Sequence, residues 1–166
     1  NLVLVGQDAK RFVDEKSGGY MTQLLNEPIF DQMHKEGAEF VWAISDQATI
    51  DAAEIKRGEN LAFITADTAE ELAAKMNLDP AVLKETIDNY NAYAAAGADP
   101  EFKRTVMKPL ASPYVAVAVV PCEIITYGGV ARNENSEVIR ADNTVIKGLY
   151  AAGEVSANSA YMGFTL

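Results

Sequence analysis

Two apolar segments in the last third of the chain carry the residue types best suited to contact a ligand. Residues 125–130 read I-T-Y-G-G-V, and residues 148–155 read G-L-Y-A-A-G-E-V. Glycine is needed where a backbone turns tightly or lies against a bound molecule. Glu154 directly follows one of these glycines, and a carboxylate held there can accept hydrogen bonds from hydroxyl groups of a cofactor. These two segments form the candidate binding site.

Both features also have an ordinary interpretation. A lone Gly-Gly pair such as Gly128-Gly129 is most often a turn or a β-bulge. A lone glutamate such as Glu154 is most often a solvated surface carboxylate. The motifs elsewhere in the chain therefore decide how these residues are interpreted.

Several further stretches occur in a fixed order along the chain. They are K-R-F-V-D-E at 10–15, A-E-E-L-A-A-K at 69–75, L-D-P at 78–80, L-K-E-T at 83–86, Y-N at 90–91 and D-P-E-F at 99–102. With the two glycine segments, they resemble the family of FAD flavoproteins that includes fumarate reductase and succinate dehydrogenase flavoprotein subunits and 3-ketosteroid dehydrogenases. The resemblance runs from about Leu2 to Leu166.

The resemblance implies a function and a set of cofactor contacts. It implies an FAD-dependent oxidoreductase that reduces or forms an activated C=C bond by hydride transfer at flavin N5, acting on a small unsaturated acid or ketone. The residues implied to contact FAD are Gly128, Gly129, Gly153, Glu154, Gly163, Thr165 and Leu166. The chain lacks the G-x-G-x-x-G fingerprint with which such proteins hold the pyrophosphate. We therefore expect a piece of a longer flavoprotein, which alone retains no FAD and whose partner is the rest of that chain.

The resemblance also implies the fold and its divisions. We expect an α+β fold in which a small mixed capping domain is flanked by strands of the FAD-binding domain, without the N-terminal Rossmann unit. The expected divisions are a flavin-domain hairpin at 1–15, a substrate-capping domain at 16–110 and a flavin-domain segment at 111–166.

Three polar groups of a fumarate site are missing from the matching positions. The family's proton-donating arginine would fall in the segment 16–21, its substrate-binding histidine matches Ile125, and no arginine follows Glu154. A dicarboxylate left unpaired in a site of low dielectric costs several kcal/mol. We therefore expect a substrate other than fumarate, with Tyr20 or Tyr127 as the catalytic acid. The alternative is that both tyrosines are packing residues.

Composition excludes several classes of partner. The formal charge of −10 disfavours nucleic acid and anionic lipid surfaces, and no apolar run is long enough to cross a membrane. With one cysteine and one histidine, we expect no metal site and no disulfide within the chain. Cys122 is predicted to be a small buried residue, His34 a surface residue and Trp42 a core residue. No targeting signal is found, and we expect a cytoplasmic protein.

Local patterns predict the elements that position these residues. Thr68 and Glu71 form a capping box, and Asp79-Pro80 begins a second helix with a buried stripe at Leu83, Ile87, Tyr90 and Ala94 that ends at Gly97. The other expected elements are strands at 2–5, 40–44, 62–66, 115–120, 130–140 and 144–150, a hairpin return at 11–13, a short helix opening at 20–25 and a helix at 49–56. Arg11 is predicted to be a structural ion-pair partner.

Two other functions are compatible with these residues. One is a non-catalytic acidic domain that binds a protein partner, with the glycines serving only as turns. The other is a true fumarate reductase whose carboxylate-binding residues lie in other parts of the parent protein. The sequence leaves the substrate, the electron donor and the oligomeric state undecided.

Overall fold

The computed structural model describes residues 2–16, 23–53, 62–122 and 129–156. The chain divides into two compact units, Asn1–Pro121 (unit 1) and Cys122–Leu166 (unit 2). Unit 1 mixes helices and strands, as expected from the sequence, and the two units are described separately below.

Unit 1 is built on a four-stranded antiparallel sheet. Its strands are β1 (Val3–Val5), β2 (Val41–Asp46), β3 (Ile64–Ala66) and β4 (Tyr114–Val119), in the order β1-β2-β4-β3. Val3 lies opposite Ile44 and Trp42 lies opposite Ala118. The strands predicted at 2–5, 40–44, 62–66 and 115–120 are confirmed. The predicted return at 11–13 is reduced to one bridge between Val5 and Arg11, because β1 forms its ladder with β2.

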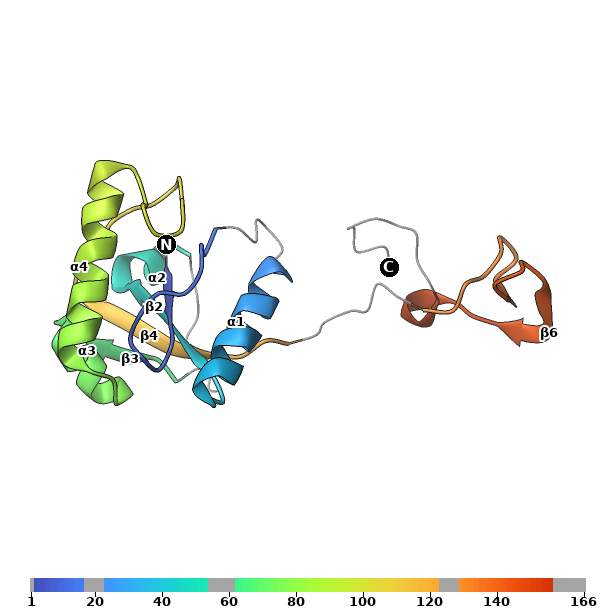
Figure 1. Ribbon diagram of the computed structural model, residues 1–166, viewed down its shortest axis with the longest axis horizontal. Helices are drawn as coiled ribbons and strands as arrows, with labels where there is room; N and C mark the ends of the chain where they lie inside the picture. The colour runs from blue at the N-terminus through green and yellow to red at the C-terminus, as the bar shows by residue number, and fades with distance from the viewer. Residues whose placement is uncertain (1, 17–22, 54–61, 123–128, 157–166) are drawn as a thin grey trace. The chain divides into compact units, whose positions relative to one another are not determined.

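Helices cover both faces of this sheet (Figure 1). They are α1 (Gln23–Glu36), α2 (Gln47–Ala52), α3 (Ala69–Met76) and α4 (Pro80–Ala96). Side chains alternate between the faces along a strand, and two core clusters follow this alternation. Val3 and Val5 of β1 belong to the cluster that includes residues of α3 and α4, whereas Leu4 belongs to the cluster that includes Leu25 and Ile29 of α1. The sheet therefore forms a middle layer between α3 and α4 on one side and α1 on the other.

The predicted caps begin α3 and α4. Thr68 Oγ1 accepts the Glu71 N–H at 3.1 Å, while the Glu71 carboxylate accepts from the Asp67 N–H at 3.3 Å. The Glu71 carboxylate therefore accepts from the residue before Thr68, and not from the Thr68 N–H that the capping box predicts. Asp79 caps α4, and the αL conformation of Gly97 ends it. Leu83, Ile87 and Tyr90 are buried as predicted.

Helix α1 is longer than the sequence predicts. It begins at Gln23 and continues through Pro28 for 14 residues, whereas the expected helix was a short one at 20–25. Proline inside a helix removes a hydrogen bond and disfavours such a continuation. Leu25, Ile29 and Met33 recur at a spacing of four residues and pack in the core cluster with Leu4 and Val41. The free energy gained by burying these apolar side chains outweighs the cost of Pro28 inside the helix.

Four charged side chains form an ion cluster that is buried in unit 1. Arg11 donates to both oxygens of Glu15, at 3.0 and 2.9 Å, and to Asp99 at 3.0 Å. Arg104 donates to Glu15 at 2.8 Å, and the side chains of Arg11, Glu15 and Arg104 are at most 2% exposed. The predicted ion-pair role of Arg11 is confirmed. The cluster ties the segment 11–15 to the loop that follows α4.

The charge of Asp99 is stabilised by its surroundings. Burial alone would raise the pKa of this carboxyl, but hydrogen bonds from the Phe102 N–H and from Arg11 outweigh it and hold the pKa below its ordinary value of 3.8. A group whose pKa is lowered by folding stabilises the fold above its unfolded-state pKa, and this contribution is lost as the pH falls through the lower, folded-state pKa.

We expect Asp99→Asn to weaken the dependence of stability on pH in the acid range. In the unchanged chain, the free energy of unfolding should fall as the pH drops below about 4, and part of this fall should be absent in the variant. Urea titrations between pH 2 and pH 6 measure it. Asp88→Asn, which removes an exposed carboxylate from α4, is the control. Parallel curves for the Asp99 variant and the unchanged chain would contradict the assignment.

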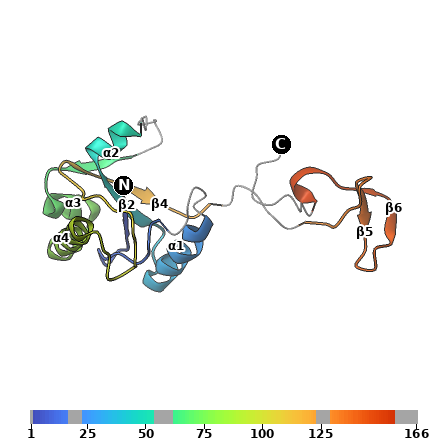
Figure 2. The same ribbon diagram turned by 90° about the horizontal axis from the view of Figure 1, so that it is seen from above.

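Unit 2 contains a hairpin and one turn of 3-10 helix. Strands β5 (Glu137–Ile139) and β6 (Val145–Tyr150) pair antiparallel (Figure 2), and η1 (Gly153–Val155) follows. The predicted turn at 141–143 joins the strands, with the Arg140 N–H donating to the Thr144 carbonyl at 2.9 Å. The first strand is shorter than the expected 130–140, because Asn133 and Ser136 close a separate turn ahead of it.

The compact units differ from the divisions expected at 15/16 and 110/111. β1 and β4 lie in segments assigned to the flavin domain, yet both hydrogen-bond to β2. The packing of this chain therefore divides only after Pro121. Which of these segments belongs to a flavin domain in the parent protein stays a prediction.

The remaining single-residue predictions have mixed outcomes. Trp42 is buried and His34 is exposed, as predicted. The prediction for Cys122 is wrong: its side chain is exposed, since the residue lies beyond the end of β4, where the chain has left the sheet. Within the described residues, no helix is long and apolar enough to span a membrane.

Candidate flavin-contacting site

The structure brings the two glycine segments of the candidate site together. Val130, next to Gly129, forms a parallel bridge with Ser156, and its N–H donates to the Val155 carbonyl at 3.2 Å. The paired residues Val130 and Ser156 are 26 positions apart in the sequence, and the two segments therefore lie side by side within unit 2. We call the hydrogen-bonded residues next to both glycine motifs, Val130 and the turn of η1 with Ser156, the glycine framework. Such a framework can present exposed glycine backbone to a ligand.

Ser156 holds this framework together and was not singled out from the sequence. Its side chain is buried, and its Oγ donates to the Gly153 carbonyl at 2.8 Å while accepting from Arg132 Nε at 3.1 Å. Its N–H also donates to the Gly153 carbonyl, at 3.1 Å. The position of Ser156 three residues after Gly153 was the available signal, because serine readily bonds to nearby backbone.

Gly153 meets both requirements that the sequence assigns to glycine. Its φ is +70°, in the left-handed region that other residues rarely adopt, and no atom lies within 4 Å of the position that a Cβ would occupy. Gly129 is also exposed. The backbone here is open to a ligand, and Glu154 follows in the same turn. Gly153 therefore leaves room for a bound cofactor, and the contact of Glu154 with the ribityl chain of FAD stays a prediction.

Most other predicted site residues cannot be placed. Tyr20, Tyr127, Gly128, Gly163, Thr165 and Leu166 lie outside the described residues, as does Ile125. Their proposed roles therefore stay predictions. Among the residues that the structure describes, no group of three or more His, Cys, Asp or Glu side chains is arranged to hold a metal ion.

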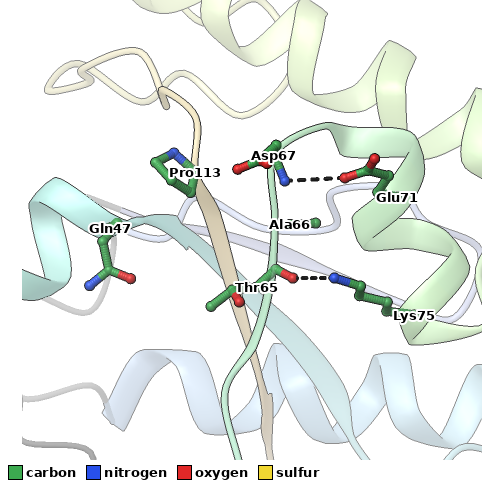
Figure 3. A pocket seen from close by; sticks show the side chains of 7 residues that line it. All are labelled: Gln47, Thr65, Ala66, Asp67, Glu71, Lys75 and Pro113. Carbon is green, nitrogen blue, oxygen red and sulfur yellow. Dashed lines mark hydrogen bonds between the residues drawn. The ribbon is translucent and has the colours of Figure 1, made fainter.

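Unit 1 also has a polar cavity of about 350 Å³ beside β3 (Figure 3). Two of its charged side chains, those of Lys75 and Glu71, hydrogen-bond to the backbone of the fold. Lys75 Nζ donates to the Thr65 carbonyl at 2.7 Å, and Glu71 accepts from the Asp67 N–H. A lysine against an edge strand is a common protection against pairing with other chains. We therefore assign this cavity a structural role.

The fold and the glycine framework agree with one class of protein. The chain belongs to the FAD binding domain family, whose family model matches residues 2–165. The resemblance of the sequence motifs to FAD flavoproteins of the fumarate reductase type is thereby confirmed. The family includes proteins that are named as oxidoreductases.

Three similar proteins illustrate this class. A probable fumarate reductase, Ifc3, of Shewanella frigidimarina is 36% identical over an alignment of 159 residues that covers 93% of this chain and 26% of the relative. An NADH:acrylate oxidoreductase of Vibrio harveyi is 38% identical over 164 residues, 94% of this chain and 16% of the relative. The open conformation of a flavocytochrome c3 fumarate reductase superposes with a TM-score of 0.73 at 33% identity, covering 94% of this chain and 27% of that one. The chain thus spans about a quarter or less of the relatives' length.

Proposed function

We propose that this chain is part of an FAD-dependent oxidoreductase that reduces or forms an activated C=C bond in a small unsaturated acid or ketone. The observation that carries the proposal is the bridge between Val130 and Ser156, which aligns the Gly129 and Gly153 segments. Two motifs that separately suit turns are more informative when one framework presents both. The similarity to flavin-dependent relatives supports the same conclusion.

We assign each of these residues a proposed role in cofactor binding or in proton transfer. When bound, the flavin would supply a hydride from N5 in its reduced form, or accept one there in its oxidised form. Gly129 and Gly153 would allow the backbone to approach the cofactor closely, Glu154 would accept hydrogen bonds from the ribityl hydroxyls, and Gly128, Gly163, Thr165 and Leu166 would complete the contacts. The capping domain expected at 16–110 would help to exclude water from the substrate. Tyr20 or Tyr127 would supply the proton.

The proposed substrate carries less charge than fumarate. Ile125 stands where the family's substrate-binding histidine is expected, and no arginine occurs at 16–21. A second carboxylate would therefore lack partners among these residues. The similarity to an NADH:acrylate oxidoreductase, named for a monocarboxylate, favours the same choice. A true fumarate reductase is the second candidate, favoured by the similarity to Ifc3.

We expect Glu154→Ala in the full-length parent to weaken FAD retention. It removes hydrogen bonds to a charged acceptor, which contribute about 1.5–3 kcal/mol. The FAD content per protein after gel filtration, read from flavin absorbance, measures the effect. The thermal stability of the flavin-free protein should barely change. Equal FAD content in the variant and in the unchanged protein would show that Glu154 does not help to hold FAD.

Two glycines provide a matched control for this site. Gly97, at the end of α4, and Gly153 both have a positive φ, +69° and +70°, and neither has a neighbouring residue near the position of an added Cβ. Alanine should therefore introduce a similar backbone strain at both positions, about 1–2 kcal/mol. Only Gly153→Ala should also reduce FAD content. A similar loss in both variants would indicate strain rather than contact with the cofactor.

A further inference from the structure

A second cavity in unit 1 has a different chemical character from the one beside β3. Its volume is about 390 Å³, which is within the range of small-molecule sites. Three segments far apart in the sequence line it: Lys16, the α2 residues Thr49 and Ala52 with the following Ala53, and the loop residues Val106, Met107 and Lys108. We call it the α2 cavity.

The buried ion cluster fixes two of the three walls relative to each other. Glu15, next to Lys16, accepts from Arg104 at 2.8 Å, and Arg104 Nε donates to the Val106 carbonyl at 3.1 Å. The Tyr90 hydroxyl donates to the Lys108 carbonyl at 3.2 Å. The backbone on both sides of the cavity is thus held by buried groups, and a site with fixed walls loses less entropy when it binds a ligand.

The third wall is fixed by Asp46. This buried residue caps α2 by accepting the Thr49 N–H at 2.6 Å, and its other oxygen accepts from the Ala111 N–H at 3.4 Å. One carboxylate therefore connects the start of α2 with the segment that continues from Lys108. Thr49 itself is among the residues that line the cavity.

The lining combines positive charge with apolar surface. Among the described residues that line it, Lys16 and Lys108 are the charged ones, in a chain whose formal charge is −10. Thr49 adds a hydroxyl donor, and Val106, Met107, Ala52 and Ala53 add hydrocarbon. The cavity beside β3, in contrast, is lined by two carboxylates and one lysine. Cations, a hydroxyl donor and apolar side chains together suit a small anion with a hydrocarbon body.

We propose that the α2 cavity binds a short-chain aliphatic carboxylate. The ammonium groups and the Thr49 hydroxyl take the carboxylate, and the apolar side chains contact the hydrocarbon. None of the residues that we propose to contact FAD lines this cavity. A failure of carboxylate binding here would therefore contradict this proposal and leave the proposed FAD-dependent function untouched. Both lysines are exposed, and solvent screening keeps such a site weak.

A nuclear magnetic resonance titration of the 166-residue chain with butyrate tests the proposal. Amide signals of Thr49, Ala52, Ala53 and Met107 should shift and saturate, with a Kd on the order of millimolar. Butyramide, which has the same shape without the charge, should leave these signals nearly unmoved. Equal shifts with butyramide, or shifts that do not saturate, would overturn the proposal.

Paired lysine variants separate a local site from the general charge of the chain. Lys16→Gln with Lys108→Gln should raise the Kd for butyrate at least tenfold. Lys35→Gln with Lys147→Gln removes the same charge from exposed positions outside the cavity and should leave the Kd unchanged. Lys16→Arg with Lys108→Arg keeps the charges and should retain binding. Equal weakening in both glutamine pairs would overturn the proposal, and signal dispersion shows that each variant is folded.

Discussion

Glu15→Gln should lower the free energy of unfolding of the 166-residue chain by about 3–5 kcal/mol, the usual cost of removing one partner from a buried charge pair. Glu15 is the hub of the ion cluster, since its carboxylate accepts from Arg11, from Arg104 and from the Leu4 N–H. The neutral amide would leave two buried guanidinium groups with only Asp99 as a charged partner inside the cluster. Equilibrium unfolding in urea measures the difference.

Glu85→Gln is the matched control, because it makes the same chemical change at an exposed position of α4. We expect it to change the unfolding free energy little, as most surface substitutions do. A loss below 1 kcal/mol for Glu15→Gln would contradict the structural importance of the cluster. Arg104→Met, which removes a second member and supplies apolar volume, should be destabilising as well, since it leaves Glu15 with fewer partners.

Replacing the tyrosine that we propose as the proton donor with phenylalanine should reduce turnover in the full-length parent by a factor of about 10² or more, with flavin binding intact. Tyr20 and Tyr127 are the two candidates for this proton donor, so each is replaced in turn. Loss of a general acid slows proton transfer to the substrate and leaves the contacts of the cofactor unchanged. The measurement is the reoxidation rate of the reduced enzyme with a panel of unsaturated acids and ketones.

The same panel tests the choice of substrate. A less charged enoate or enone should be reduced faster than fumarate. Tyr93→Phe removes a phenol that donates to Glu101 at 3.3 Å on unit 1, and this control should retain full turnover. Fast turnover with fumarate, unaffected by replacement of Tyr20 or Tyr127, would identify the parent as a fumarate reductase and both tyrosines as packing residues.

Local signals were sufficient for the helices α3 and α4. Thr68 and Asp79 are followed by the residues that a capped helix start requires, and Gly97 suits the left-handed conformation that ends α4. These signals act within a few residues, so sequence shows them directly. The length of α1 was missed because its local penalty, Pro28, is visible in the sequence while the contacts of Leu25 and Ile29 with β1 and β2 are not.

The family and the motifs that we propose to contact the flavin can be recognised from the sequence, because glycine spacing and a following carboxylate are properties of short segments. Only the tertiary structure decided that the two motifs share one framework through Ser156 and that Arg11, Glu15, Asp99 and Arg104 meet in one buried cluster. Arg11 and Asp99 are 88 residues apart. Such contacts depend on which sheet edges and loops the folded chain brings together, and no local pattern encodes that choice.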